Sequence, residues 1–241
     1  MPFLCGNLRS RGLNEIFTVS ISTANRYQKL MTTLSLDNTL TTVIIIFTVK
    51  PEQQQDLIET IKEFLRTVKT QPGFVSANLH KSIDGVKVAN YAQWSSMETF
   101  KAFRDNQEVQ AKAQKLFEFD TPDSHVYEIV ASESKVGTPK IKEGEYIVHF
   151  AEFRMQPDNQ PKMVELAKEH LKPAMEQPGL ISATFHRSLD GTRVINYGQW
   201  QDKAAIEELV KKPGFSKEQP YWDGIADNEY HLYEVVHTVN S

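Results

Sequence analysis

Apolar positions between residues 43 and 68 change from a continuous run to a helical spacing. Residues 43–49 are mostly β-branched or aromatic, which predicts a buried strand. After Pro51, which the first turn of a helix tolerates, apolar residues recur every three or four positions. These are Leu57, Ile58, Ile61, Phe64, Leu65 and Val68. The spacing predicts an amphipathic helix, which Gln71-Pro72-Gly73 ends because proline disfavours helix in the residue before it.

The next segment predicts two strands joined by a tight turn. Residues 75–94 centre on Asp84-Gly85, a dipeptide typical of two-residue hairpin turns. Ser95 and Glu98 have the spacing of a capping box, which predicts a second helix. Residues 126–130 predict a closing strand. The order strand, helix, strand, strand, helix, strand is that of a ferredoxin-like α+β domain.

The same pattern returns in the second half of the chain at a constant offset of 106 residues. The matching segments include Gln71-Pro72-Gly73 and Gln177-Pro178-Gly179, His80 and His186, Asp84-Gly85 and Asp190-Gly191, Asn90-Tyr91 and Asn196-Tyr197, Gln93-Trp94 and Gln199-Trp200, and His125 and His231. A period this long indicates a duplicated domain rather than a solenoid, whose repeats run to roughly 20 to 50 residues. We predict two tandem domains, residues 41–134 and 145–241, joined by a linker over 135–144.

The second copy departs from the first within its second helix. Its predicted elements are a strand over 146–154, a helix from Pro157 to about Met175, a hairpin around Asp190-Gly191, a helix from about Asp202 and a strand over 231–237. Pro213-Gly214 and residues 220–224 replace the helix-compatible residues 107–118 of the first copy. We therefore expect a loop in the second copy only, and two different clefts.

Residues 1–40 have no counterpart in the second copy. They are rich in Ser, Thr, Asn and Arg and lack a clear amphipathic pattern, so we expect a poorly ordered N-terminal extension. A transit-like leader is the alternative, and Met31 is a second candidate for the start of the chain.

Composition restricts the class of partner. The 241 residues carry a net charge of −4 with both signs interleaved, which argues against a nucleic-acid groove or a polybasic membrane patch. The longest apolar run is far shorter than the about 20 residues that span a bilayer. The single cysteine, Cys5, lies outside both repeats, which argues against a disulfide framework or a zinc cluster and favours the reducing cytoplasm.

The hairpin register sorts side chains onto two faces. With Asp84-Gly85 as the turn, Leu79 lies opposite Asn90 and Val75 opposite Trp94, and such partners share a face. This face also carries Ala77, Val88, Ala92 and, at its end, Lys81; in the second copy it carries Asn196, Trp200, Ile181, Ala183, Phe185, Val194 and Arg187. The other face carries Ser76, Asn78, His80, Tyr91 and Gln93. We expect the apolar face to meet the helices and the polar face to form an interface layer in which His80 and His186 make hydrogen bonds.

An asparagine between sheet and helices needs hydrogen-bond partners, because an unsatisfied amide costs roughly 1–3 kcal/mol. Water or a ligand could complete the bonds of Asn90 and Asn196, which would make each copy a binding site. Alternatively, both amides bond to nearby backbone while Trp94 and Trp200 only fill the core. The residue types alone leave both interpretations open.

The stretch from His80 through the Asp-Gly turn to Asn-Tyr-(Ala/Gly)-Gln-Trp, in a ferredoxin-like pattern, resembles the antibiotic biosynthesis monooxygenase family of the dimeric α+β barrel superfamily. The resemblance covers both copies, about three quarters of the chain. It implies two domains packed sheet to sheet in a barrel, normally a homodimer, with ligand bound between each sheet and its helices. Here the barrel would form within one chain as a monomeric pseudo-dimer, with further self-association left open.

The resemblance also implies a reaction. Relatives oxidise polycyclic phenols, anthrones or quinols with O2 and without metal or flavin, so no cofactor is expected and the partners are a small aromatic substrate and O2. Asn90 and Asn196 would bind the substrate oxygen, and Trp94 and Trp200 would line the pocket as catalytic residues. The substrate-binding candidates are Leu79, Lys81, Phe100, Phe185, Arg187 and Tyr221.

Two departures from the family concern the anchor of the substrate, and a missing histidine argues against haem degradation. The family's tyrosine six residues after the tryptophan is Phe100 or Ile206 here, and its arginine is Gln114 or Pro220. Lys81, Arg187 or Tyr221 would have to replace that anchor. Haem-degrading relatives need a histidine on or just after the second helix, where residues 95–124 and 201–230 have none. The remaining alternative is a non-enzymatic, stress-response or ligand-binding barrel.

Overall fold

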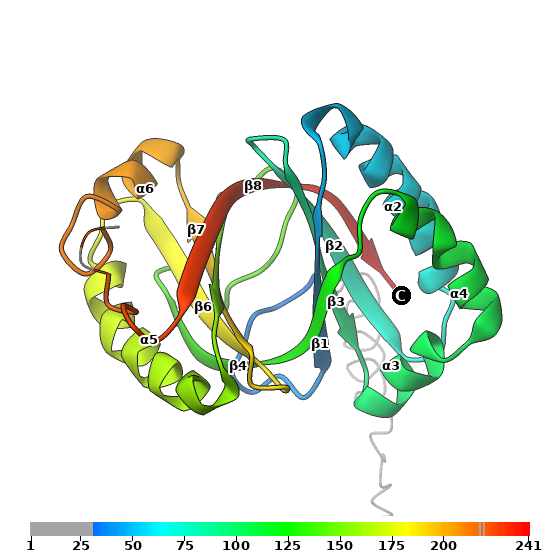
Figure 1. Ribbon diagram of the computed structural model, residues 1–241, viewed down its shortest axis with the longest axis horizontal. Helices are drawn as coiled ribbons and strands as arrows, with labels where there is room; N and C mark the ends of the chain where they lie inside the picture. The colour runs from blue at the N-terminus through cyan, green and yellow to red at the C-terminus, as the bar shows by residue number, and fades with distance from the viewer. Residues whose placement is uncertain (1–30, 217, 219) are drawn as a thin grey trace, which may run out of the picture. The chain divides into compact units, whose positions relative to one another are not determined.

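The computed structural model describes residues 31–216, 218 and 220–241, whose strands form a closed barrel (Figure 1). The strands are β1 (Thr41–Thr48), β2 (Phe74–Ser82), β3 (Lys87–Trp94), β4 (Asp123–Ser134), β5 (Ile147–Arg154), β6 (Leu180–Ser188), β7 (Arg193–Trp200) and β8 (Asp227–Asn240). Their order around the barrel is β1-β3-β2-β8-β5-β7-β6-β4. The tandem ferredoxin-like domains and the intrachain α+β barrel are thus confirmed.

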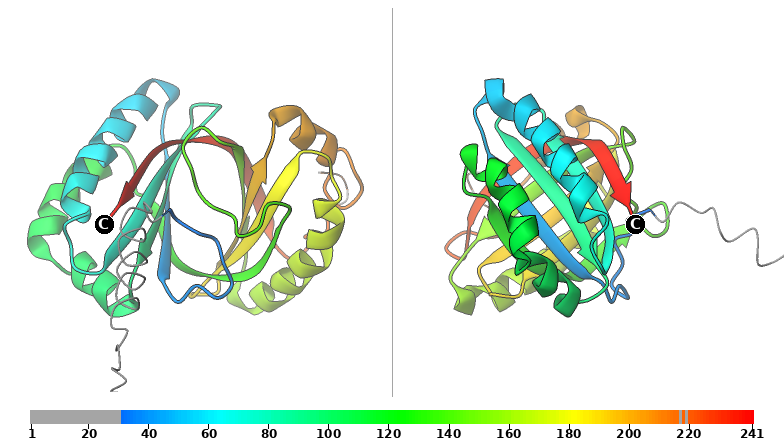
Figure 2. Two further views of the ribbon diagram at one scale, coloured as in Figure 1. Left: turned by 180° about the vertical axis from the view of Figure 1, so that it is seen from behind. Right: turned by 90° about the vertical axis from the view of Figure 1, so that its right-hand side faces the viewer.

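Helices cover the barrel on two opposite sides, one set from each half (Figures 1 and 2). The first half has η2 (Pro51–Gln53), α2 (Gln54–Val68), α3 (Met97–Arg104), α4 (Gln107–Ala113) and η3 (Gln114–Glu118); the second has η4 (Pro157–Asn159), α5 (Gln160–Met175) and α6 (Lys203–Leu209). Between α6 and β8 the described residues form no helix, as predicted. The second helix of the first half begins after Ser96. Its capping box is formed by Ser96 and Thr99, so the prediction of Ser95 and Glu98 was wrong by one residue.

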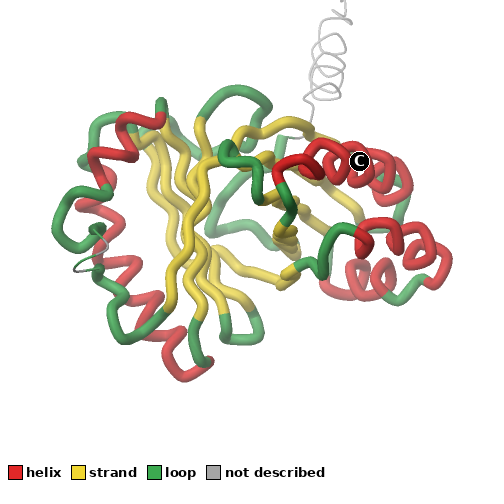
Figure 3. Tube along the Cα trace, turned by 45° about the horizontal axis from the view of Figure 1, so that its top comes forward, coloured by secondary structure: helices red, strands yellow, loops and turns green. Residues whose placement is uncertain are grey.

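The closing strands are longer than predicted because each belongs to both halves. β4 pairs with β1 of its own half and with β6 of the other, and β8 pairs with β5 and with β2. Figure 3 shows the strands lying between the helices of the two halves. A sheet that closes on itself exposes no edge to another chain, so the duplicated chain completes its own barrel.

The hairpin register is confirmed except at one end. Leu79 pairs with Asn90 and lies on the helix-facing side, in an apolar cluster with Trp94. Trp94, however, pairs with Phe74 rather than with Val75, because the ladder shifts register between Phe74 and Ser76. Phe74 therefore takes the place predicted for Val75 and packs edge-on against Trp94 at 5.6 Å between ring centroids.

The opposite face fills the barrel with polar and aromatic side chains from both halves. His80 Nδ1–H donates to the Asn78 carbonyl, and its Nε2 lies 2.9 Å from the hydroxyl of Tyr197, which donates to it. The mirrored pair, Tyr91 Oη and His186 Nε2, is 3.1 Å apart. Burial lowers the pKa of His80 to about 4, so the ring stays neutral and Nε2 accepts the hydrogen bond from the tyrosine hydroxyl. The predicted interface hydrogen bonds are confirmed.

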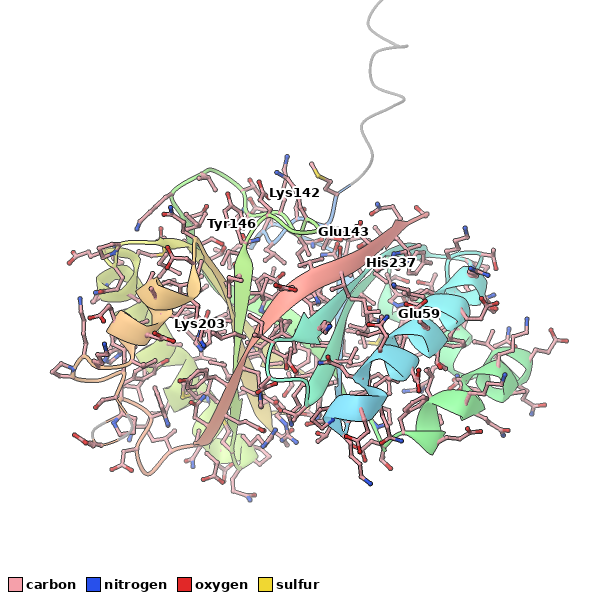
Figure 4. The ribbon with its side chains drawn as sticks, turned by 90° about the horizontal axis from the view of Figure 1, so that it is seen from above. Glu59, Lys142, Glu143, Tyr146, Lys203 and His237 are labelled. Atoms are coloured by element: carbon pink, nitrogen blue, oxygen red, sulfur yellow. The ribbon has the colours of Figure 1, made fainter. Side chains whose placement is uncertain are left out.

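The segment before β1 and the linker lie side by side. Leu34 is fully buried, and its N–H donates to the Pro139 carbonyl at 2.9 Å, while the N–H of Ile141 donates to Thr32. Glu143 lies beside the C-terminal part of β8 and accepts hydrogen bonds from Thr238 (Figure 4). The predicted poorly ordered extension, Cys5 included, lies outside the described residues up to residue 30, whereas residues 31–40 contribute to the fold. No helix in the described part of the chain is long and apolar enough to cross a membrane.

Two matching charge clusters join the halves where each hairpin turn meets the opposite closing strand. His125 on β4 contacts Asp123 and the turn residue Asp190, both at 2.5 Å. In the same way His231 on β8 contacts Glu229 at 2.9 Å and the turn residue Asp84 at 2.6 Å. Each histidine thus links one half's closing strand to the other half's turn.

The cluster around His125 predicts a pH-dependent contribution to stability. Its hydrogen bond to Asp123, and then that to Asp190, raises the pKa of His125, while the hydrogen bond from His125 lowers the pKa of Asp123 to about 2. The nearby Arg193 and Glu152 complete the cluster. A histidine whose pKa is raised by folding contributes stability that is fully present below the unfolded pKa of about 6.5. This stability is lost as the pH rises through the folded pKa.

We therefore expect His125→Gln to reduce the free energy of unfolding by not more than about 1 kcal/mol near pH 6, because the pair reaches solvent. At a pH above the raised pKa of folded His125, the same substitution should have a smaller effect. Urea denaturation of both proteins at the two pH values measures the difference. An equal loss at both values would show that the charge of His125 contributes nothing to the stability of the fold.

Candidate active site

A cavity of about 1070 Å³ lies in the second half between its part of the sheet, its helices and the loop that follows α6. Its sheet wall includes His149, Ala151, Phe153, Phe185, Asn196, Trp200 and, from β8, Tyr230 and His231. Its other walls include His170, Leu171, Phe215, Tyr221 and Trp222. The loop predicted from Pro213-Gly214 therefore forms one side of the cavity.

Three polar atoms of the cavity wall are buried without a hydrogen-bond partner in the protein. They are Oδ1 of Asn196, Nε1 of Trp200 and Nε2 of His149. A buried polar atom left unsatisfied costs about 1–3 kcal/mol, so folding alone gives no reason to collect three of them on one wall. The side chains that carry them line the cavity, so a molecule that contacts these atoms would find an acceptor, a donor and a titratable ring nitrogen.

The strand pairing explains how these three side chains come together. His149 on β5 pairs with Gly198 on β7, and Gly198 stands between Asn196 and Trp200. A Cβ atom at Gly198 would lie 2.9 Å from Nε1 of Trp200 and 3.6 Å from Cβ of His149. Only the absence of a side chain at residue 198 leaves room for the indole N–H in this position. The first half has Ala92 at the equivalent position.

Aromatic rings form much of the remaining wall. His170 stacks on Tyr221 with 4.2 Å between ring centroids, and its Nδ1–H donates to the Leu166 carbonyl. Trp222 packs edge-on against Tyr221 and Phe153. Burial raises the pKa of Tyr221, so its hydroxyl stays protonated at neutral pH. Such a wall favours a flat apolar molecule.

Side chains occupy the corresponding space in the first half. The ring of Trp94 lies 4.5 Å from that of Phe103 and 5.9 Å from that of Phe100. Leu116 and Phe119, from the helical segment that the second half lacks, pack against the same cluster. Asn90 Oδ1 is buried without a partner there too. The two halves therefore keep the same asparagine and tryptophan in different surroundings.

The structure separates the predicted site residues into three groups. Asn196, Trp200, Phe185 and Tyr221 line the cavity. Arg187 does not line the cavity; its guanidinium forms an ion pair with Glu128 at 2.6 Å. The predicted residues of the first half are Asn90, Trp94, Leu79, Lys81 and Phe100, of which Leu79, Trp94 and Phe100 belong to its apolar cluster.

Sequence reasoning missed His149, His170 and Trp222. The 106-residue offset contains the signal for the first two, because they replace Val43 and Phe64 of the first copy. A polar ring in place of an apolar core residue indicates that the interior of the second half differs from that of the first. Among the described residues no group of three or more His, Cys, Asp or Glu side chains is arranged to hold a metal ion.

Comparison with known proteins identifies the family. The antibiotic biosynthesis monooxygenase family matches the chain twice, over residues 41–115 and 146–220. The chain belongs to this family. A tetracenomycin-F1 monooxygenase from Streptomyces glaucescens is 38% identical over 81 residues, which are 33% of this chain and 72% of that protein.

Among solved structures of this fold, an anthrone oxidase-like protein superposes with a TM-score of 0.75 at 23% identity, covering 87% of this chain and 96% of its own. At that identity the likeness concerns the fold. Membership of the antibiotic biosynthesis monooxygenase family supports a monooxygenase-type function on a small molecule, with O2 as the second reactant.

Proposed function

We propose that the second half is the active site of a cofactor-independent monooxygenase that oxidises an aromatic phenol, quinol or anthrone with O2. The observation that carries the proposal is the cavity wall with three unpartnered polar atoms, those of Asn196, Trp200 and His149. A non-enzymatic barrel whose Asn and Trp only fill the core would need no such cavity.

The proposed chemistry requires no cofactor because the substrate anion itself donates electrons to O2. The protein then has to orient the substrate, exclude water and stabilise negative charge as it develops. The N–H of Trp200 is a donor for a substrate oxygen, and the amide of Asn196 can bind a second oxygen or its hydroxyl. Both lie on one rigid sheet wall, which holds them in place before the reaction begins.

The size of the cavity favours a polycyclic substrate. Small-molecule sites typically enclose about 300–1000 Å³, and this cavity, at about 1070 Å³, slightly exceeds the upper end of that range. The similar Streptomyces protein is named for a tetracenomycin substrate, which agrees with a substrate of several fused rings.

The proposal is tested by O2 uptake with dithranol, a dihydroxyanthrone, after subtraction of its spontaneous oxidation. We expect catalysed uptake of one O2 per anthrone converted to quinone and water. Trp200→Phe removes the N–H but keeps an aromatic ring, and should lower kcat/KM about tenfold, as expected for a lost hydrogen bond to a charged oxygen. Trp94→Phe should change it less than about twofold.

Two outcomes would reject the proposal. One is a wild-type rate no higher than the spontaneous rate for dithranol and for representative polycyclic phenols and quinols. The other is a loss in Trp94→Phe as large as that in Trp200→Phe, which would place the chemistry outside this cavity.

A further inference from the structure

His149 lies at the centre of the polar wall. Its partner across the ladder, Gly198, stands two residues from Asn196 and two from Trp200, so all these side chains leave the sheet on one face. Diagonal neighbours in a ladder lie about 7–8 Å apart or less, within reach of one bound ring system. A substrate held by Asn196 and Trp200 would therefore have the imidazole of His149 beside it.

The ring of His149 packs edge-on against that of Tyr230 at 5.0 Å between centroids, a contact that an apolar ring could also make, so packing does not require a histidine here. The neighbouring positions of β5 on the same face are Ile147, Ala151 and Phe153, and the first half has Val43 at the equivalent place. His149 is almost fully buried, and its Nε2 has no partner in the protein. The side chain thus replaces an apolar residue that the fold accepts, and gains no hydrogen bond at Nε2.

The other histidines of the cavity wall are engaged elsewhere. His170 donates through Nδ1 to the Leu166 carbonyl and stacks on Tyr221. His231 has both ring nitrogens bonded to carboxylates, those of Asp84 and Glu229. Of these three imidazoles, His149 is the one beside the asparagine and the tryptophan.

Burial lowers the pKa of His149 to about 4, because a charged ring is poorly solvated there. At neutral pH the ring is uncharged and one of its nitrogens has a free lone pair. Proton transfer from a bound substrate would create an imidazolium beside a substrate anion, and attraction between the two charges offsets the poor solvation.

We propose that His149 is the catalytic base that ionises the substrate. The inference rests on the proposed function. A substrate C–H or O–H bond breaks, its electron pair stays on the substrate, and the proton binds Nε2 of His149. The carbanion form adds O2 to give a peroxide anion, which takes the proton back from His149. The hydroperoxide then loses water to leave a carbonyl, so one O2 is consumed, one water is formed and His149 returns to its starting state.

The test separates ionisation from oxidation by using dithranol in the absence of O2, where the coloured enolate is observed directly. Wild-type protein should bind dithranol and generate the enolate band. His149→Gln keeps the size and polarity of the side chain, and His149→Val restores the residue of the first half. Both variants should bind dithranol without the band. After admission of O2 their rate should be at least about 100-fold lower than that of wild type, the range for general-base catalysis.

Chemical rescue distinguishes a base from a structural role. In His149→Ala, added imidazole should restore O2 uptake at least about tenfold, whereas it should not restore Asn196→Ala. Enolate formation that is unchanged in His149→Gln and His149→Val would overturn the inference, as would wild-type protein that binds dithranol without ionising it. An enolate in wild type without O2 uptake would uphold the base and reject the oxygenase. Failure of wild type to bind dithranol, and equally the polycyclic phenols and quinols, would reject both.

Discussion

Replacing Asn196 with alanine should lower kcat for O2 uptake about 100- to 1000-fold, the usual effect of removing one group that stabilises a developing oxyanion. The Asn196 amide lies on the cavity wall, where its Nδ2–H groups are the donors that would bind this oxyanion, while its buried, unpartnered Oδ1 can only accept a hydrogen bond. If the amide binds the anion more tightly than the neutral substrate, kcat should fall while KM changes little. Steady-state kinetics with dithranol separates the two parameters.

The duplicated chain provides a matched control in Asn90→Ala. Asn90 occupies the same place in the ladder of the first half, where Trp94 is packed against Phe100 and Phe103. We expect O2 uptake to remain within about twofold of wild type, because the proposed site does not include this residue. A large loss in Asn90→Ala with little change in Asn196→Ala would assign the active site to the first half.

The order and register of the elements could be predicted because each depends on local periodicity. A period of two defines the hairpin, helical spacing defines α2 and α5, and the 106-residue offset tests each assignment twice. The error at Val75 arises from a shift in the ladder, since Phe74 moves into contact with Trp94. Such a shift reflects packing in three dimensions and leaves no periodic signal.

The lengths of β4 and β8 depend on partners in the other half of the chain. Beyond residue 130, β4 continues alongside β6, and β8 extends past the predicted 231–237 at both ends, alongside β5 and β2. Partly exposed strand positions carry weak apolar alternation, so the sequence indicated only the middle of each strand.

The candidate site was predictable only as far as the hairpin reached. The register brings Asn196, Phe185 and Trp200 to one face, and the structure agrees. The cavity itself depends on atoms that are missing relative to the first half, at Gly198 and in the loop after α6. The wall also includes His149. Its strand is otherwise apolar, so this residue stands out only by comparison with Val43, its equivalent in the first copy.

Fusion of two domains allows what a homodimer cannot do, because identical subunits must have identical sites. The first half packs apolar residues around Trp94, which adds buried surface to a domain that would be thin on its own. The second half keeps a large cavity, which by itself destabilises a fold because its lining atoms lose packing contacts. The shared barrel lets the packing of one half offset the cavity of the other.

That shared interior predicts the largest effect on stability, which we expect for Tyr197→Ala. Tyr197 is fully buried in the barrel, and its ring lies against those of Phe150, Tyr91 and His80 at 5.0, 5.9 and 5.6 Å between centroids. Removing a buried aromatic ring typically lowers the free energy of unfolding by about 3–5 kcal/mol. The loss is measured by urea denaturation followed by circular dichroism.

Tyr197→Phe separates the ring from its hydroxyl. It keeps the packing but removes the donor to Nε2 of His80, so a buried acceptor is left unsatisfied at a cost of about 1–3 kcal/mol. We expect a loss smaller than that of Tyr197→Ala, and a further substitution of His80 by leucine should recover part of it, because both polar partners are then gone. Equal losses in the two Tyr197 variants would mean that the hydrogen bond across the barrel, rather than ring packing, holds the two halves together.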